Sequence, residues 1–283
     1  MAESFLEQLT VPRGSVDLSS YDPEDTPGFS GDKGDAADTL TALGDELSDL
    51  QERLFAEGRH GGTRSVLLVL QGMDTSGKGG IVRHAVGLVD PQGVHITSFK
   101  APTEEERQHD FLWRVEPRVP EPGMLGVFDR SHYEDVLIAR VRGLASPDEI
   151  ERRYDAINAF ERRLVDGGTT VLKCMLHISA DEQKKRLQRR LDSPDKRWKF
   201  NPSDIDERRF WPAYMEAYEI ALERTGTEHA PWLVVPGDRK WYGKLAVAQV
   251  LLETFRRLDP AWPAPTFDVD EQRRRLAEED PLS

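Results

Sequence analysis

Residues 72–80 read Gly-Met-Asp-Thr-Ser-Gly-Lys-Gly-Gly and have the types and spacing of a loop that binds phosphate. Glycines let backbone N–H groups converge on phosphate oxygens, and a lysine among them adds a positive charge. Gly72, four intervening residues, Gly77 and Lys78 fit the spacing of a P-loop. That motif continues with a Ser or Thr that binds Mg²⁺, where this chain has Gly79. We therefore expect Asp74, inside the loop, to serve as a metal ligand instead.

A second polar group begins at Asp129, directly after the apolar run 124–128, and continues to Asp135. In P-loop proteins, an Asp at the end of an apolar strand commonly holds Mg²⁺ near the phosphates. We expect Asp129 to play this part. Arg130 beside it is expected to contact a phosphoryl group through its planar guanidinium.

A concentrated basic segment lies between Gln183 and Lys199. It holds eight Lys and Arg residues against Asp192 and Asp195, although the whole chain has a net charge of −13. This distribution argues against the coating of nucleic acid and suits a small or linear phosphate substrate held in one place. An arginine-rich helix here would suit a kinase lid that closes over phosphates and excludes water. A solvated helix face, the usual role of a charge run, is the alternative.

The elements that must position these groups alternate between strands and helices. Apolar runs predict five strands, at 65–70, 94–99, 124–128, 170–178 and 232–235. Helical patterns separate them, notably around 81–86, 146–166, 180–192, 204–224 and 242–257. The alternation predicts a three-layer α/β/α fold with a mostly parallel five-stranded sheet and a helical lid at about 181–209. Ligands lie beyond the carboxyl ends of such strands, where the glycine-rich loop and Asp129 fall.

The chain has 283 residues, of which 38% are hydrophobic, so it can bury a sizeable core. Residues 1–35 are rich in Pro, Gly, Ser and Asp, which predicts an irregular arm rather than a packed element. Leucines at 40, 43, 47, 50 and 54 predict one helix whose apolar stripe packs within its own domain. That domain is expected to span 36–260, followed by a polar, peripheral tail at 261–283.

Several observations bear on location. No apolar run approaches the roughly 20 residues that cross a bilayer, and no secretory signal is visible at the first residues. Cys174 is the only cysteine, so no internal disulfide is expected, and its apolar neighbours indicate a buried core residue. The histidines show no zinc-ligand spacing. We expect a cytoplasmic protein with no membrane partner.

Taken together, these segments resemble the polyphosphate kinase 2 family. The matching stretches are QGMDTSGK (71–78), SFKAPT (98–103), FDRSHYEDVL (128–137), WKF (198–200), APW (230–232) and DRKW (238–241). The resemblance extends from about residue 40 to 260. It implies a P-loop kinase fold that moves phosphoryl groups between inorganic polyphosphate and nucleotides, with Mg²⁺ as cofactor and Mn²⁺ as an alternative.

Carried over to this sequence, the resemblance implies a set of catalytic and binding residues. Asp74 and Asp129 would be the essential carboxylates and metal ligands, Lys78 the phosphate lysine, and Arg130 a phosphate ligand. Arg190 would come from the lid. The expected phosphate- and nucleotide-binding residues are Gly72, Thr75, Ser76, Gly77, Gly79, Gly80, Lys100, Glu134, Lys184 and Arg186. Polyphosphate is expected to run along Lys78, Lys100, Arg130 and the lid arginines, with the acceptor nucleotide opposite.

The acceptor range depends on the stretch His132-Tyr133-Glu134-Asp135. It is similar to family members that phosphorylate both mono- and diphosphates, whereas diphosphate-only members tend to have Trp-Tyr-Asn there. Dual-acceptor members often carry Asn at the position of Asp129, from which this chain departs. We expect reversible phosphorylation of AMP to ADP and of ADP to ATP, with diphosphates alone, or an ATP-driven monophosphate kinase, as alternatives. A non-catalytic nucleotide-binding regulator is disfavoured because Asp74, Lys78, Asp129 and Arg190 are all present.

The expected partners are therefore inorganic polyphosphate and adenine or guanine nucleotides, with no nucleic acid. A homo-oligomer, dimer or tetramer, is expected as well.

Overall fold

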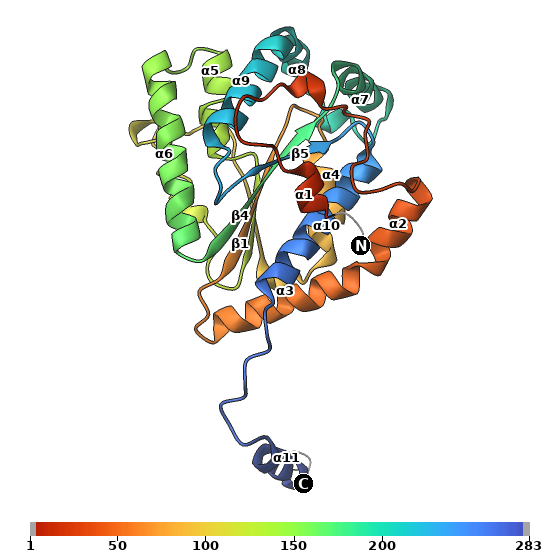
Figure 1. Ribbon diagram of the computed structural model, residues 1–283, viewed down its shortest axis with the longest axis vertical. Helices are drawn as coiled ribbons and strands as arrows, with labels where there is room; N and C mark the ends of the chain where they lie inside the picture. The colour runs from red at the N-terminus through yellow and green to blue at the C-terminus, as the bar shows by residue number, and fades with distance from the viewer. Residues whose placement is uncertain (1–3, 280–283) are drawn as a thin grey trace.

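A five-stranded parallel sheet forms the centre of the computed structural model, which describes residues 4–279 (Figure 1). The strands are β1 (Ser65–Gln71), β2 (Val94–Ser98), β3 (Leu125–Asp129), β4 (Thr169–His177) and β5 (Trp232–Pro236). They lie in the order β2-β3-β1-β4-β5, and each neighbouring pair is parallel. The predicted α/β fold and all five predicted strands are confirmed.

Strand β1 lies in the middle of the sheet, and apolar side chains cover both of its faces. Val66, Leu68 and Leu70 point into one core cluster, which α3, α4 and α10 complete. Leu67 and Val69 point into the other, which includes side chains of α6 and α9. Alternate residues of a strand face opposite sides, so a run of apolar residues predicts a strand buried on both faces. The three-layer arrangement follows from this burial (Figure 1).

The helices lie on both faces of the sheet. Their bounds are α1 (Phe5–Leu9), α2 (Lys33–Ala42), α3 (Gly44–Arg59), α4 (Lys78–His84), α5 (Ile138–Val141), α6 (Pro147–Asp166), α7 (Ala180–Asp192), α8 (Ser203–Glu207), α9 (Trp211–Thr225), α10 (Lys240–Leu258) and α11 (Val269–Glu278). The predicted leucine-striped helix is two helices, α2 and α3, which meet at Leu43. Gly44 opens α3, and glycine is a poor helix former. The stripe packs within the domain, as predicted, because Leu43, Leu47 and Leu54 are buried in the core.

The N-terminal segment is packed, which corrects the prediction of an unpacked arm. Helix α1 buries Phe5, Leu6 and Leu9, and Thr10 forms an antiparallel bridge with Leu233 of β5. The backbone N–H of Phe5 donates to Glu253 on α10 at 2.8 Å. A few widely spaced apolar side chains are enough to anchor this segment, although its composition is that of a loop.

The C-terminal segment lies outside the core. Helix α11 buries none of its residues and stands away from the sheet (Figure 1), while residues 280–283 of the predicted tail are outside the described part. Cys174 on β4 is fully buried, as predicted, and burial raises its pKa to about 12. Among the helices of residues 4–279, none is long and apolar enough to span a membrane.

Candidate active site

The glycine-rich loop joins the carboxyl end of β1 to α4 and has the backbone of a tight turn. Gly72 has φ +150°, and a Cβ there would lie 2.8 Å from the carbonyl oxygen of Leu176. No other residue type fits this position, so the loop requires glycine for both conformation and space. Lys78 opens α4 and folds back over the loop, where its Nζ donates to the Gly72 carbonyl at 2.7 Å.

A cavity of about 680 Å³ lies over this loop, at the carboxyl ends of the strands. It brings together most of the predicted site residues: Asp74, Thr75, Ser76, Gly77, Lys78, Gly79, Gly80, Lys100, Asp129, Arg130, Arg186 and Arg190. Gly72, Glu134 and Lys184 do not line it. The prediction that Gly72 contacts phosphate is replaced by the conformational role described above.

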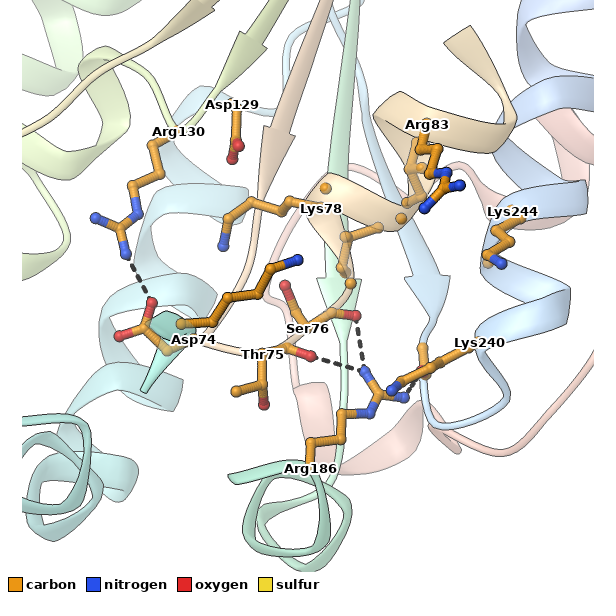
Figure 2. Close-up of a pocket in the computed structure, with 18 of the residues that line it drawn as sticks. Asp74, Thr75, Ser76, Lys78, Arg83, Asp129, Arg130, Arg186, Lys240 and Lys244 are labelled. Carbon is orange, nitrogen blue, oxygen red and sulfur yellow. Dashed lines mark hydrogen bonds and ion pairs between the residues drawn. The ribbon is translucent and has the colours of Figure 1, made fainter. Parts of the chain in front are cut away.

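The two predicted carboxylates reach the cavity from different strands. Asp129 ends β3 and pairs in register with Leu70 of β1, which places it beside the start of the loop. Asp74 comes from the loop itself, and its Oδ1 accepts a hydrogen bond from Arg130 Nη2 at 2.6 Å (Figure 2). Arg130 has φ +63°, a conformation that is uncommon for a residue other than glycine and that often occurs at functional sites.

These oxygens suit a hard cation such as Mg²⁺. Within residues 4–279, no group of three or more His, Cys, Asp or Glu side chains is placed to hold a metal. A metal held by Asp74 and Asp129 would therefore take its other ligands from water and substrate phosphates, which is how Mg²⁺ commonly binds in kinases. The donor set fits Mg²⁺ better than Zn²⁺, which prefers nitrogen and sulfur ligands.

Two hydroxyl groups of the loop have no hydrogen-bond partner within the described residues. They are those of Thr75 and Ser76, and both oxygen atoms are buried. Buried polar atoms are seldom left unpaired, so this arrangement suits a loop whose hydroxyl groups bond to phosphate oxygens when a substrate binds. Burial lowers the pKa of Lys78, although the nearby Asp74 acts in the opposite direction.

Glu134 does not line the cavity, although its charge acts on Lys78 and Arg130, which do. Burial raises the pKa of its carboxyl group, and Arg130 and Lys78 oppose this increase. It therefore influences the charge of the loop without lining the space where a substrate would lie. Its predicted role as a direct phosphate or nucleotide ligand is not supported.

The cavity is strongly basic, with eleven Lys and Arg residues against Asp74 and Asp129. Sequence reasoning placed Arg189, Lys196 and Lys199 in the basic lid segment, but it did not assign Arg83, Lys240 or Lys244 to the site. Lys240 and Lys244 are four residues apart on α10, so they share a helix face. This spacing, in a helix that follows the carboxyl end of a predicted strand, is a signal that marks them as candidates, although packing decides whether that face meets the loop.

The charges are unequally distributed across the loop (Figure 2). Asp74, Asp129 and Arg130 lie on one side of Lys78, toward β3, and Arg83, Lys240 and Lys244 lie on the other. We call these the carboxylate side and the basic side. Burial, followed by the charges of Arg186 and Arg189, lowers the pKa of Lys240 to about 8.

The basic segment forms helix α7 and the turns after it, and the faces of the helix differ. Arg186, Arg189 and Arg190 face the cavity, as residues three and four apart on a helix do. Lys184 instead lines a separate groove with Leu187, on the opposite face. The prediction that Lys184 binds phosphate in this cavity was therefore wrong, because the helical period turns its side chain away.

Two of the predicted lid arginines have partners within the protein. Arg186 is buried and bonds to the loop backbone, so the start of α7 is fixed to the P-loop rather than free to swing over it. Arg190 donates to the Lys199 carbonyl at 3.0 Å and lies 3.5 Å from Asp204 on α8. Both of these partners belong to the lid, so Arg190 can move with it. If the lid moves, we therefore expect the moving part to begin beyond Arg186 in the chain.

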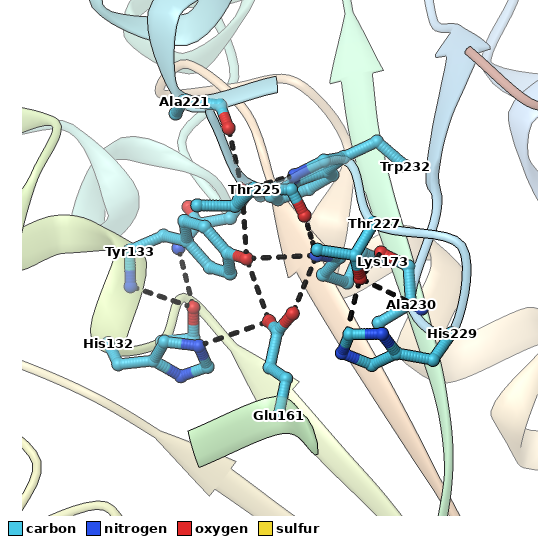
Figure 3. A network of polar contacts seen from close by, with 12 residues as sticks. His132, Tyr133, Glu161, Lys173, Ala221, Thr225, Thr227, His229, Ala230 and Trp232 are labelled. Carbon is cyan, nitrogen blue, oxygen red and sulfur yellow. Dashed lines mark hydrogen bonds and ion pairs between the residues drawn. The ribbon is translucent and has the colours of Figure 1, made fainter. Parts of the chain in front are cut away.

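A buried polar network supports the segment that carries Asp129 and Arg130 (Figure 3). Lys173 Nζ on β4 lies 2.7 Å from Glu161 Oε2 on α6, and both side chains are fully buried. The Tyr133 hydroxyl donates to Glu161 Oε1 at 2.7 Å, and Lys173 also donates to the Thr225 carbonyl at 2.7 Å. The network therefore joins β4, α6 and α9 to the turn that begins three residues after Asp129.

The P-loop, two carboxylates and a basic cavity at the carboxyl end of a parallel sheet define a P-loop phosphotransferase. The chain matches the model of the polyphosphate kinase 2 (PPK2) family over residues 30–261, and it belongs to that family. It is thus a kinase of the polyphosphate:nucleotide phosphotransferase type.

Similar proteins span nearly the whole chain. The AMP/ADP-polyphosphate phosphotransferase of Meiothermus ruber is 48% identical over 254 residues, which cover 90% of this chain and 94% of that protein. The ADP-polyphosphate phosphotransferase of Rhodopseudomonas palustris is 40% identical over 277 residues and covers 92% and 93%. The crystal structure of polyphosphate kinase 2 from Arthrobacter aurescens TC1 shares 55% identity and superposes with a TM-score of 0.96 over 98% of both chains.

Proposed function

We propose that this protein transfers phosphoryl groups reversibly from inorganic polyphosphate to AMP and ADP, with Mg²⁺ as cofactor. The observation that carries the proposal is the division of one cavity into a basic side and a carboxylate side, with Lys78 between them. A long polyanion suits the basic side, and an acceptor nucleotide suits the side where two carboxylates can share a cation.

The chain's own residues would act mainly by alignment and charge neutralisation, which phosphoryl transfer chiefly requires. Arg83, Lys240 and Lys244 would bind the polyphosphate chain, and Lys78 would contact the phosphate in transit. Asp74 and Asp129 would hold Mg²⁺, which when bound offsets negative charge on the phosphates. Arg130, held by Asp74, would contact the acceptor phosphate. This arrangement differs from the expected single track, because Lys100 and Arg130 follow β2 and β3, far from α10 in the sheet order.

The acceptor range is the finer part of the proposal. The His132-Tyr133-Glu134-Asp135 stretch favours both AMP and ADP, and the Meiothermus ruber relative is named for both acceptors. The Rhodopseudomonas palustris relative is named for ADP alone. Asp129 near an acceptor phosphate repels it unless a cation intervenes, so use of AMP should depend steeply on Mg²⁺. Guanine nucleotides as acceptors, a homo-oligomeric assembly and a cytoplasmic location stay predictions.

The test is incubation of the protein with polyphosphate, Mg²⁺ and each of AMP, ADP, GMP and GDP, followed by chromatography of the nucleotides. We expect ADP from AMP, and ATP from ADP, only when polyphosphate and Mg²⁺ are both present. Equal product without polyphosphate would indicate adenylate kinase chemistry. ATP from ADP together with no product from AMP at saturating Mg²⁺ would restrict the enzyme to diphosphates.

A further inference from the structure

Arg186 on α7 has an acceptor for every N–H group of its guanidinium. Its Nε donates to Glu182 at 2.8 Å, and its Nη1 donates to the carbonyls of Thr75 and Ser76, both at 2.9 Å. Its Nη2 donates to the carbonyls of Gly237 and Asp238 at 2.5 and 3.0 Å. A guanidinium has five N–H donors, so these five contacts leave none for a phosphate.

The four carbonyls belong to two separate segments. Thr75 and Ser76 lie in the P-loop after β1, and Gly237 and Asp238 lie in the turn between β5 and α10. Arg186 therefore joins the P-loop to the turn that begins the helix of Lys240 and Lys244, and does so from α7 (Figure 2). It is only 3% exposed, so solvent does not compete for these bonds.

The contacts with the P-loop bear on how the loop presents its N–H groups. In a trans peptide the C=O and the following N–H point in opposite directions. Because Arg186 holds the Ser76 carbonyl, the N–H of Gly77 must point away from Arg186, and Gly77 lines the cavity. Thr75 has φ +68°, which is unfavourable for a β-branched residue and needs support from its surroundings. Arg186 supplies that support at the Thr75 carbonyl.

We propose that Arg186 is a positioning residue that sets the peptide orientations of the P-loop and does not itself bind phosphate. The proposal rests on the proposed function, in which the loop binds the phosphate in transit. It predicts that loss of Arg186 misaligns the reacting phosphate. A misplacement of about 1 Å can cost about a hundredfold in rate.

The chain offers a matched control three residues away. Arg189 lies on the same helix and lines the same cavity, but its side chain is 56% exposed and its bonds stay within α7, to Glu182 and Lys185. Removing Arg189 takes away one positive charge from the cavity without releasing the loop. A lysine in place of Arg186 does the opposite, since it keeps the charge but has one nitrogen, which cannot reach both segments at once.

The experiment compares steady-state kinetics of Arg186→Ala, Arg186→Lys and Arg189→Ala, with polyphosphate varied at saturating ADP. We expect both Arg186 variants to lose about a hundredfold in kcat, whereas Arg189→Ala raises the KM for polyphosphate and changes kcat little. Guanidinium ion at non-denaturing concentration should restore part of the kcat of Arg186→Ala, and ammonium ion should not. Thermal unfolding of each variant checks that the fold persists.

Two outcomes would overturn the proposal. Normal kcat in Arg186→Lys would mean that charge alone suffices, and it decides the matter even where Arg186→Ala does not fold. A rise in the polyphosphate KM with unchanged kcat in Arg186→Ala would make Arg186 a phosphate ligand. Failure of the proposed function would appear separately, as inactivity of the parent protein with polyphosphate.

Discussion

Asp74 and Asp129 illustrate how single residues define this site. Asp129 is placed by strand register, because it pairs with Leu70 immediately before the loop. Asp74 is placed by the loop and held by Arg130 at 2.6 Å. Gly79 stands where a hydroxyl ligand is usual, and Asp74 and Asp129 are the carboxylates that line the cavity, so they are the metal ligands that we propose.

The first prediction at this scale concerns these carboxylates. Asp74→Asn or Asp129→Asn should lower kcat by about a hundredfold or more, as expected when one group that stabilises the transition state is removed. The loss should shift the dependence on Mg²⁺ to higher concentration, and the melting temperature should change little because neither side chain is buried. Near-normal kcat in Asp74→Asn would mean that the loop holds the metal in another way. Steady-state kinetics at several Mg²⁺ concentrations provide the measurement.

The second concerns Lys240, whose pKa is lowered to about 8. Below that pH the ammonium is charged and attracts polyphosphate, and above it the charge is lost. The KM for polyphosphate should therefore rise between pH 7 and pH 9 in the parent. Lys240→Arg should flatten this increase because a guanidinium stays charged. Identical pH dependence of KM in the two proteins would exclude Lys240 as the titrating group.

The strands and helices that carry the site residues determine which of those residues could be predicted from the sequence. Asp129 was predictable because it ends an apolar strand, and Lys78 because it ends the glycine-rich loop that follows another one. The carboxyl ends of parallel strands meet at one edge. Lys240 and Lys244 were missed because their role depends on which face of α10 turns toward the loop, and long-range packing decides that. The burial of Arg186 could not be predicted for a similar reason, since its charge is visible in the sequence and its packing is not.

The strands were predictable from continuous apolar runs, whereas packing of α1 depends on Phe5 and Leu9 meeting α10 and β5 across more than 200 residues of chain. No local pattern contains that information. The break between α2 and α3 had a local signal in Gly44, which the leucine spacing obscured.

The third prediction belongs to the elements that the buried network joins. Lys173→Met leaves Glu161 charged and buried without its partner, so the free energy of unfolding should fall by about 3–5 kcal/mol. Urea denaturation provides the measurement. Arg163→Met is the matched control, because its pair with Glu116 is exposed and should contribute no more than about 1 kcal/mol. A loss in Lys173→Met no larger than in this control would contradict the prediction.

The network also gives stability a pH dependence of definite sign. Burial opposes ionisation of Glu161, but Lys173 and His132 outweigh it and lower its pKa. A lowered carboxyl pKa contributes stability above the unfolded pKa, and this contribution is lost as pH falls through the folded value. Acid should therefore destabilise the parent more steeply than Glu161→Gln.

The whole molecule has a net charge of −13, whereas eleven basic residues line its cavity. The attraction for polyphosphate is therefore local and close to the site. The fourth prediction is that the KM for polyphosphate rises strongly with salt, because binding a polyanion releases counterions and salt screens the field. The KM for ADP, which has fewer charges, should rise less. Equal slopes for the two substrates would show that the basic side does not bind the polymer.

The division of the cavity also predicts the stereochemistry of the reaction. If, as we propose, the donor binds on the basic side of Lys78 and the acceptor on the carboxylate side, the phosphoryl group passes between them in a single in-line displacement. One displacement inverts the configuration at phosphorus. A donor whose terminal thiophosphate is made chiral with oxygen isotopes should therefore yield the γ-thio analogue of ATP with inverted configuration at the γ-phosphorus. Retention would require two displacements through an enzyme side chain such as His84, which also lines the cavity.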